Sequence, residues 1–141
     1  MPPIDLNNLR FFVDETSLGI GKPLVLLRRD VIHAGHPLLP EVPFGTLDPV
    51  WMPVVAAKDL VVITRDKRIR TKHAKVMLLA EHGLRIFWLA GKKDLSNWET
   101  MRLLVRRWDE MERKIKERGD GPWFMAISDA GIREMSITVR D

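Results

Sequence analysis

Acidic residues follow two apolar runs of this sequence at the point where each run ends. Residues 9–13 (LRFFV) run directly into Asp14 and Glu15, and residues 60–63 (LVVI) precede Asp66 by three positions. Short apolar runs rich in β-branched and aromatic residues predict buried strands. In open α/β sheets, binding and reacting groups collect just beyond the carboxyl ends of the strands. We therefore expect Asp14 and Asp66 to be neighbours in space.

These acids, together with Asp48 at the predicted start of a helix, indicate a site for a divalent cation. Carboxylates a few ångströms apart raise one another's pKa unless a cation lies between them. Mg2+ and Mn2+ prefer carboxylate oxygen, and either ion can lower the pKa of a bound water and neutralise charge on a phosphoryl oxygen. The chemistry that follows is hydrolysis of a phosphodiester bond.

Alternating strands and helices position these acids. Sequence periodicity predicts strands at 9–13, 31–32, 60–63, 84–89, 122–127 and 132–139, and helices at 18–29, 49–58, 69–82 and 97–118. This order is typical of an α/β fold with a parallel sheet covered by helices on both faces. Right-handed crossovers then bring the strand tips to one edge. Asp48 before Pro49 predicts a helix N-cap, and Ser96 with Glu99 predicts a capping box.

Composition limits the classes of protein that the chain can be. Its 141 residues include no cysteine, which excludes a disulfide framework, a thiolate zinc site and a cysteine nucleophile. The length predicts a single domain, residues 1–141. No apolar run approaches the roughly 18 residues of a membrane span, and the first residues lack the pattern of a signal peptide, so we expect a cytoplasmic protein with no membrane partner. The formal charge of +4 permits a nucleic-acid partner.

Three motifs resemble those of a known nuclease family. FFVDE at residues 11–15, Asp48 with Trp51 three positions on, and VVITRDK at residues 61–67 are similar in order and spacing to PIN-like domains. The likeness covers roughly residues 11–89 and is nearest to the compact branch that includes VapC-type toxins of toxin and antitoxin pairs. It implies a three-layer, Rossmann-like α/β fold with a mostly parallel central sheet flanked by helices.

The resemblance also implies an activity and the residues that carry it. A PIN-like domain of this branch is a metal-dependent endoribonuclease, and its catalytic, metal-binding acids carry over to Asp14, Asp48 and Asp66, with Mg2+ or Mn2+ as the cofactor. Many members have a further acid shortly after the third one, where this chain has basic residues, so either Glu15 completes the metal site or the metal is held more loosely here. The resemblance implies a homodimer and a cognate antitoxin as protein partners.

Basic residues surround Asp66 in the sequence and suit an RNA substrate, namely Arg65, Lys67, Arg68, Arg70, Lys72 and Lys75. We expect RNA phosphates to contact four of these side chains, namely Arg65, Lys67, Arg68 and Arg70. Such contacts position the strand without reading its sequence, and they weaken as salt rises. Trp51 is expected in the core, with stacking on an RNA base as the alternative.

Two other functions fit parts of the pattern. A non-catalytic PIN-like module that holds RNA or a protein would explain the missing fourth acid. A receiver-like phosphoacceptor domain would use Asp66 with Lys92 or Lys93, but Asp66 lies in a basic segment. The long apolar stripe from Trp98 to Met111 is expected in the core, with part of it open to an antitoxin helix or a second copy of the chain.

Two short motifs are not expected to carry chemistry. GIGKP at residues 19–23 lacks the full glycine spacing of a phosphate loop and the Ser or Thr that follows its lysine. His33 and His36 lie in a proline-rich segment, outside the helical setting in which two histidines at this spacing bind metal.

Overall fold

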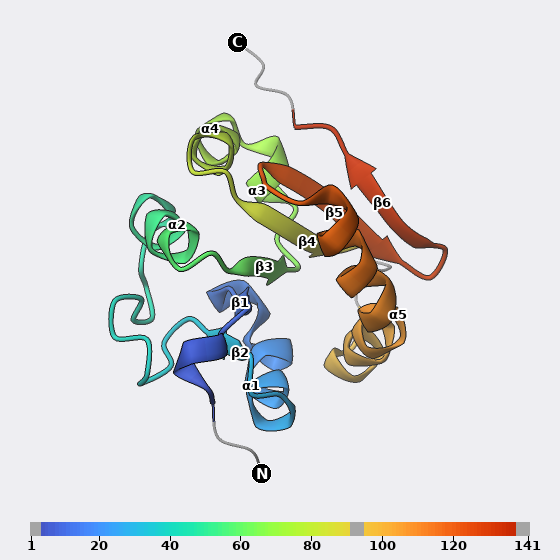
Figure 1. Ribbon diagram of the computed structural model, residues 1–141, viewed down its shortest axis with the longest axis horizontal. Coiled ribbons are helices and arrows are strands. Elements are labelled where there is room, and N and C mark those ends of the chain that lie inside the picture. The colour runs from blue at the N-terminus through green and yellow to red at the C-terminus, as the bar shows by residue number, and fades with distance from the viewer. Residues whose placement is uncertain (1–3, 91–94, 138–141) are drawn as a thin grey trace.

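A computed structural model describes residues 4–90 and 95–137 of the chain, and these residues form one sheet with helices on both sides (Figure 1). The strands are β1 (Phe11–Val13), β2 (Val31–His33), β3 (Val61–Thr64), β4 (Arg85–Leu89), β5 (Trp123–Ser128) and β6 (Gly131–Met135). The helices are α1 (Leu18–Leu27), α2 (Asp48–Ala57), α3 (Arg68–Thr71), α4 (His73–Glu81) and α5 (Asn97–Arg118), with 3-10 turns η1 (Leu6–Asn8) and η2 (Glu15–Ser17).

The six strands lie in the order β2-β1-β3-β4-β5-β6. The first five are parallel, and β6 pairs with β5 in the antiparallel sense. Val13 lies opposite His33 on one side and Ile63 on the other, so β1, β2 and β3 end at the same edge of the sheet. The predicted α/β fold with a mostly parallel sheet is therefore confirmed, and its first three strands deliver their following residues to one place.

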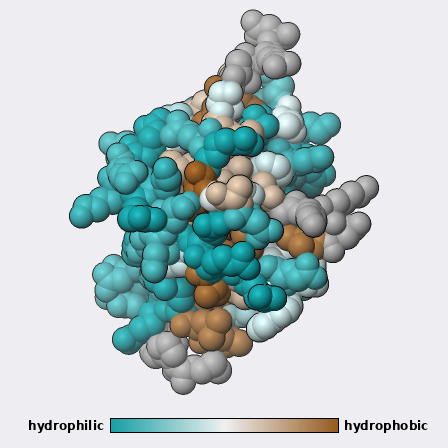
Figure 2. All heavy atoms as spheres, turned by 90° about the vertical axis from the view of Figure 1, so that its right-hand side faces the viewer, coloured by the Kyte–Doolittle hydropathy of each residue, from teal (hydrophilic) through white to brown (hydrophobic). Residues whose placement is uncertain are grey.

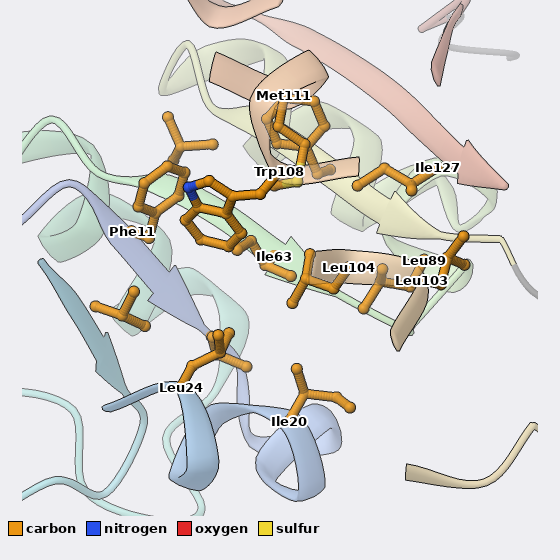
Figure 3. Packing of buried hydrophobic residues seen from close by; sticks show 14 of the residues in the cluster. Phe11, Ile20, Leu24, Ile63, Leu89, Leu103, Leu104, Trp108, Met111 and Ile127 are labelled. Carbon is orange, nitrogen blue, oxygen red and sulfur yellow. The ribbon is translucent and has the colours of Figure 1, made fainter. Parts of the chain in front are cut away.

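The two faces of the sheet bury two separate cores. Neighbouring strand residues point to opposite faces, so Phe11 joins the core under α1 and α5 while Phe12 joins the core under α2, α3 and α4. Figure 3 shows the first core, in which the Trp108 ring of α5 lies 4.9 Å from that of Phe11 between ring centroids. Because helices cover both faces of the sheet, the strand residues on both faces are apolar, which explains the continuous apolar runs in the sequence.

Two helices differ from their predicted form. The segment predicted as one helix over 69–82 is two helices, since Lys72 has an extended backbone (φ −81°, ψ 123°) between α3 and α4. The break still lets Ile69 and Leu79 reach the same core. At the start of α5, the Ser96 hydroxyl accepts a hydrogen bond from the Glu99 backbone N–H at 3.0 Å, so the predicted cap is confirmed.

The predicted apolar stripe of α5 is only partly buried. Leu104, Trp108 and Met111 pack on the sheet, whereas Trp98 is 71% exposed and Val105 is 60% exposed. At 3.6 residues per turn, these two positions point roughly 100° away from the centre of the buried face. Figure 2 shows the side of the molecule that carries α5 and β6, where hydrophilic side chains dominate and apolar ones form a narrow band. No helix in the described part of the chain is long and apolar enough to cross a membrane.

Candidate active site

The three acids predicted to be catalytic line one small pocket at the carboxyl edge of the sheet, and Glu15 lines it as well. The pocket encloses about 90 Å3, and Asp14, Asp48 and Asp66 are in its wall together with Arg68 and Lys75. Asp14 follows β1 directly, Asp66 comes two residues after β3, and Asp48 is the first residue of α2. The parallel strands thus bring together acids that are far apart in the sequence.

Asp14 is the most deeply buried of the three acids. Its Oδ2 accepts a hydrogen bond from the Thr16 hydroxyl at 2.7 Å, while its Oδ1 is buried and has no hydrogen-bond partner among the described residues. Burial raises the pKa of Asp14, the nearby charge of Asp66 adds to the rise, and the hydroxyls of neighbouring residues oppose it. A buried polar atom without a partner costs about 1–3 kcal/mol, so this oxygen is a strong candidate for a ligand atom.

Asp66 is held by Arg68, the first residue of α3. The Arg68 guanidinium donates to both carboxylate oxygens, with Nε 2.9 Å from Oδ1 and Nη2 3.3 Å from Oδ2, and the Arg68 backbone N–H donates to Oδ1 at 3.0 Å. Burial alone would raise the pKa of Asp66, but the hydrogen bonds and charge of Arg68, with the charge of Lys75, lower it overall. Asp66 is therefore ionised at neutral pH.

Asp48 does not cap its helix, which corrects the prediction from Asp48-Pro49. Leu47 has the extended backbone of an N-cap, and Asp48 already belongs to the helix. Its carboxylate makes contacts with other side chains instead. Its Oδ1 accepts a hydrogen bond from Trp51 Nε1 at 2.8 Å, and its Oδ2 lies 2.7 Å from the Lys75 ammonium. A negative charge in the first turn remains favourable for the helix dipole.

Lys75 of α4 bridges two of the acids. Its Nζ lies 2.7 Å from Asp48 Oδ2 and 3.8 Å from Asp66 Oδ2, and its side chain is 24% exposed. The sequence placed Lys75 only among the basic residues near Asp66, because no local pattern marks which lysine of a helix turns toward a distant acid. The structure adds it to the candidate site.

Glu15 has a different contact from the one predicted for it. It lines the same pocket, and its Oε1 accepts a hydrogen bond from the Gly45 backbone N–H at 2.9 Å. Glu15 therefore ties the loop between β2 and α2 to the end of β1. The predicted role of Glu15 as a metal ligand stays a prediction.

The carboxylate oxygens of the pocket are suitable ligands for a hard divalent cation, but two of the acids are engaged in ion pairs. Three carboxylates with one bare buried oxygen are the ligands that Mg2+ and Mn2+ prefer. Within the described residues, however, no group of three or more acidic or histidine side chains is close enough to hold a metal ion. Lys75 and Arg68 make ion pairs with Asp48 and Asp66, so a cation would bind all three acids only after these pairs open.

The four basic residues predicted to contact RNA separate into different surroundings. Arg68 lines the pocket. Arg65 is drawn to the start of α5, where its Nη2 donates to the Leu95 carbonyl at 3.0 Å. The Arg70 guanidinium lies 5.8 Å from the centre of the Phe124 ring, and Lys67 is exposed. Only one of the four thus belongs to the pocket wall.

Other predicted motifs behave as core or as ordinary helix. Trp51 is 6% exposed and stacks on Phe12, so its place in the core is confirmed and base stacking by this residue is wrong. GIGKP forms part of α1 and is no phosphate loop. Lys92 and Lys93, which a receiver-like site would need, lie outside the described residues.

A second pocket lies elsewhere and has mixed charge. It encloses about 730 Å3 and, among the described residues, shares no lining residue with the acid pocket. The described part of its wall holds two glutamates and three basic residues, namely Glu110, Glu117, Arg113, Lys114 and Arg133. Glu110 already accepts a hydrogen bond from the Ile132 backbone N–H at 2.9 Å, within the packing of α5 on β6. The smaller acid pocket is therefore the better candidate for chemistry.

Comparison with known families gives one match. The family model described as PIN-like domain matches residues 9–91, which is more than half of the 141 residues. The matched segment contains all the acidic and basic residues of the pocket described above. Comparison with curated proteins and with solved structures gave no significant match.

Proposed function

The chain belongs to the PIN-like domain family, and from this premise we propose that it is a metal-dependent endoribonuclease. PIN domains are generally nucleases that typically use divalent metals. The observation that carries the proposal is the buried Oδ1 of Asp14, which has no hydrogen-bond partner among the described residues and lies in a pocket shared with three further acids. A protein gains nothing in stability from a desolvated carboxylate oxygen without a partner, so such an atom favours a ligand role.

Asp14, Asp48 and Asp66 would hold Mg2+ or Mn2+, with Glu15 beside them. The bound ion would neutralise charge on the phosphate and lower the pKa of a water. Arg68 and Lys75, released from their acids, would then face the phosphate oxygens from the pocket wall. Charged donors in a partly buried site stabilise the negative charge that develops on phosphate during cleavage.

The finer biological assignment is also a proposal. We propose a VapC-type toxin, acting in the cytoplasm on RNA, with the whole chain 1–141 as one domain. The six-stranded sheet supports this extent, because β5 and β6 continue it past the matched segment. A cognate antitoxin or a second copy of the chain would find exposed apolar side chains on α1 and α5, namely Leu26, Leu27, Trp98 and Val105.

Substitution of the buried acid tests the proposal. Asp14→Asn keeps the shape of the side chain and removes its charge, so we expect RNA cleavage in Mn2+ to fall by at least about a hundredfold, with an unchanged circular dichroism spectrum. Asp109→Asn, at an exposed position of α5, is the matched control and should retain full activity. EDTA should abolish cleavage by the wild-type protein, and Mn2+ should restore it. Full activity of Asp14→Asn would contradict the assignment.

A non-catalytic binding module is the second candidate. The ion pairs of Lys75 with Asp48 and of Arg68 with Asp66 favour it, because they neutralise two acids without any metal. This candidate predicts RNA binding without EDTA-sensitive cleavage, and no rise in Tm on addition of Mn2+. EDTA-sensitive cleavage in the experiment above, or a rise in Tm measured with added Mn2+, would contradict the binding module and support the nuclease.

A further inference from the structure

The loop between β2 and α2 carries an exposed aromatic ring. Phe44 is 54% exposed. A Cβ atom added to Gly35 would lie 2.4–2.6 Å from three carbon atoms of this ring, so the ring packs directly on the glycine. Gly35 also has φ +79°, a conformation that favours glycine. One side of the ring is thereby supported while much of its surface is open to solvent.

Hydrogen bonds on both sides fix the position of this ring. The Gly35 backbone N–H donates to the Val42 carbonyl at 2.8 Å, which closes the loop beneath Phe44. The next residue, Gly45, donates its N–H to Glu15 at 2.9 Å. The loop that carries the ring is therefore tied to Glu15, the residue that follows Asp14 at the end of β1.

The loop that carries the ring forms part of the wall of the acid pocket. Pro43 and Thr46, which flank the Phe44-Gly45 pair, both line the pocket, and so does Ala34, the neighbour of Gly35. The same pocket wall holds the acids, Arg68 and Lys75. The exposed ring is thus carried by a loop whose neighbouring residues share the pocket wall with side chains that suit a phosphate.

We propose that Phe44 is a stacking subsite for one nucleobase of single-stranded RNA, next to the phosphate that is bound in the pocket. This inference rests on the proposed function. Bases stack on aromatic side chains with little sequence preference, contributing about 1–3 kcal/mol per base. A base inside a duplex cannot reach such a ring without leaving its stack. The arrangement therefore selects single-stranded RNA over double-stranded RNA and contributes little to base identity.

Binding measurements in a cleavage-deficient background test the subsite. In the Asp14→Asn protein, the fluorescence anisotropy of a labelled single-stranded RNA of about 12 nucleotides gives Kd. Phe44→Ala should weaken binding about 5- to 100-fold, which corresponds to the free energy of stacking one base, and Phe44→Trp should retain it. Leu38→Ala, at a 48% exposed position of the same loop, is the matched control and should leave Kd unchanged. Phe44→Leu keeps apolar packing on Gly35, so it should show the same loss as Phe44→Ala if base stacking is lost. Retained binding in Phe44→Leu would mean that Phe44→Ala acts by perturbing the loop, and would overturn the subsite.

Abasic nucleotides show whether the ring meets a base. An abasic site is placed at each position of the RNA in turn. At one position, the abasic site should weaken binding to the protein that has Phe44. At the same position it should not weaken binding further in Phe44→Leu. The subsite would be overturned if the abasic site and Phe44→Leu weakened binding additively at every position. An unchanged Kd in Phe44→Ala and Phe44→Leu would overturn it as well. Either result would leave the proposed RNA cleavage intact. Absence of both RNA binding and RNA cleavage in proteins that retain Asp14 would overturn the proposed function and the subsite together.

Discussion

At the scale of single residues, the site is defined by how its charges are paired. Among the described residues, Asp14 has a buried oxygen without a hydrogen-bond partner, whereas Asp48 and Asp66 each have a basic partner. Lys75 is the partner that both acids share, and its ammonium has the charge that a cation would otherwise supply. Metal binding by these acids and the ion pairs of Lys75 are therefore in competition.

This competition predicts the effect of removing Lys75. Lys75→Met keeps most of the apolar stem and deletes the ammonium, so Asp48 and Asp66 should bind Mn2+ about tenfold more tightly, the equivalent of ~1.4 kcal/mol. Titration with Mn2+, followed by the electron paramagnetic resonance signal of the free ion, measures this affinity without reference to activity.

Lys67→Met is the matched control for Lys75→Met. It removes the same charge from an exposed side chain next to Asp66 in the sequence, so it should change the Mn2+ affinity much less. Equal effects of the two substitutions would mean that net charge alone is responsible. Unchanged or weaker Mn2+ binding in Lys75→Met would show that its ammonium does not compete with the metal.

The predictability of these residues from sequence follows from the range of their contacts. Asp14 and Asp66 could be placed together because strand ends and crossover handedness are local or general rules. The roles of Lys75 and Phe44 could not be predicted, since each depends on which distant residue its side chain meets. Asp48 was misassigned as a cap because Leu47 takes that backbone position instead.

At the scale of elements, the loop between β2 and α2 connects the pocket to the surface. Its sequence predicted only an irregular segment, because its proline and glycine residues break regular structure. In the folded chain it is fixed by short-range turns and by the hydrogen bond from Gly45 to Glu15. The strands were easier to predict, since burial on both faces makes them apolar throughout.

Two substitutions of Glu15 separate a loop tether from a metal ligand. Glu15→Gln keeps an oxygen that accepts from the Gly45 N–H and removes the charge, whereas Glu15→Ala removes both. If the tether is the main role, Gln should retain most RNA cleavage, and Ala should weaken RNA binding severalfold without changing the affinity for Mn2+.

Metal affinity and loop dynamics decide between the two roles of Glu15. Hydrogen exchange of the Gly45 amide should be faster in Glu15→Ala than in the wild-type protein. The reason is that exchange no longer requires the hydrogen bond between the Gly45 N–H and Glu15 to break first. A comparable fall of Mn2+ affinity in Glu15→Gln and Glu15→Ala would instead identify Glu15 as a metal ligand.

At the scale of the whole molecule, one sheet serves two purposes. Its buried faces hold the two cores, and its carboxyl edge gathers the acids and the loop that carries Phe44 in one region. The formal charge of +4 is spread over many elements, and several basic side chains are tied to other parts of the protein. The formal charge of the chain therefore overstates how many basic side chains face a ligand in the pocket.

The salt dependence of RNA binding reports which of these cations meet phosphate. Each phosphate contact with a single strand contributes about −0.7 to the slope of log K against log salt concentration. Arg68→Gln should reduce the magnitude of the slope by about that amount, because Arg68 lines the pocket. Arg65→Gln should leave the slope unchanged, since the Arg65 guanidinium is bound to the Leu95 carbonyl at the start of α5. Equal reductions in both variants would mean that RNA extends past the pocket onto the Arg65 side of the sheet edge.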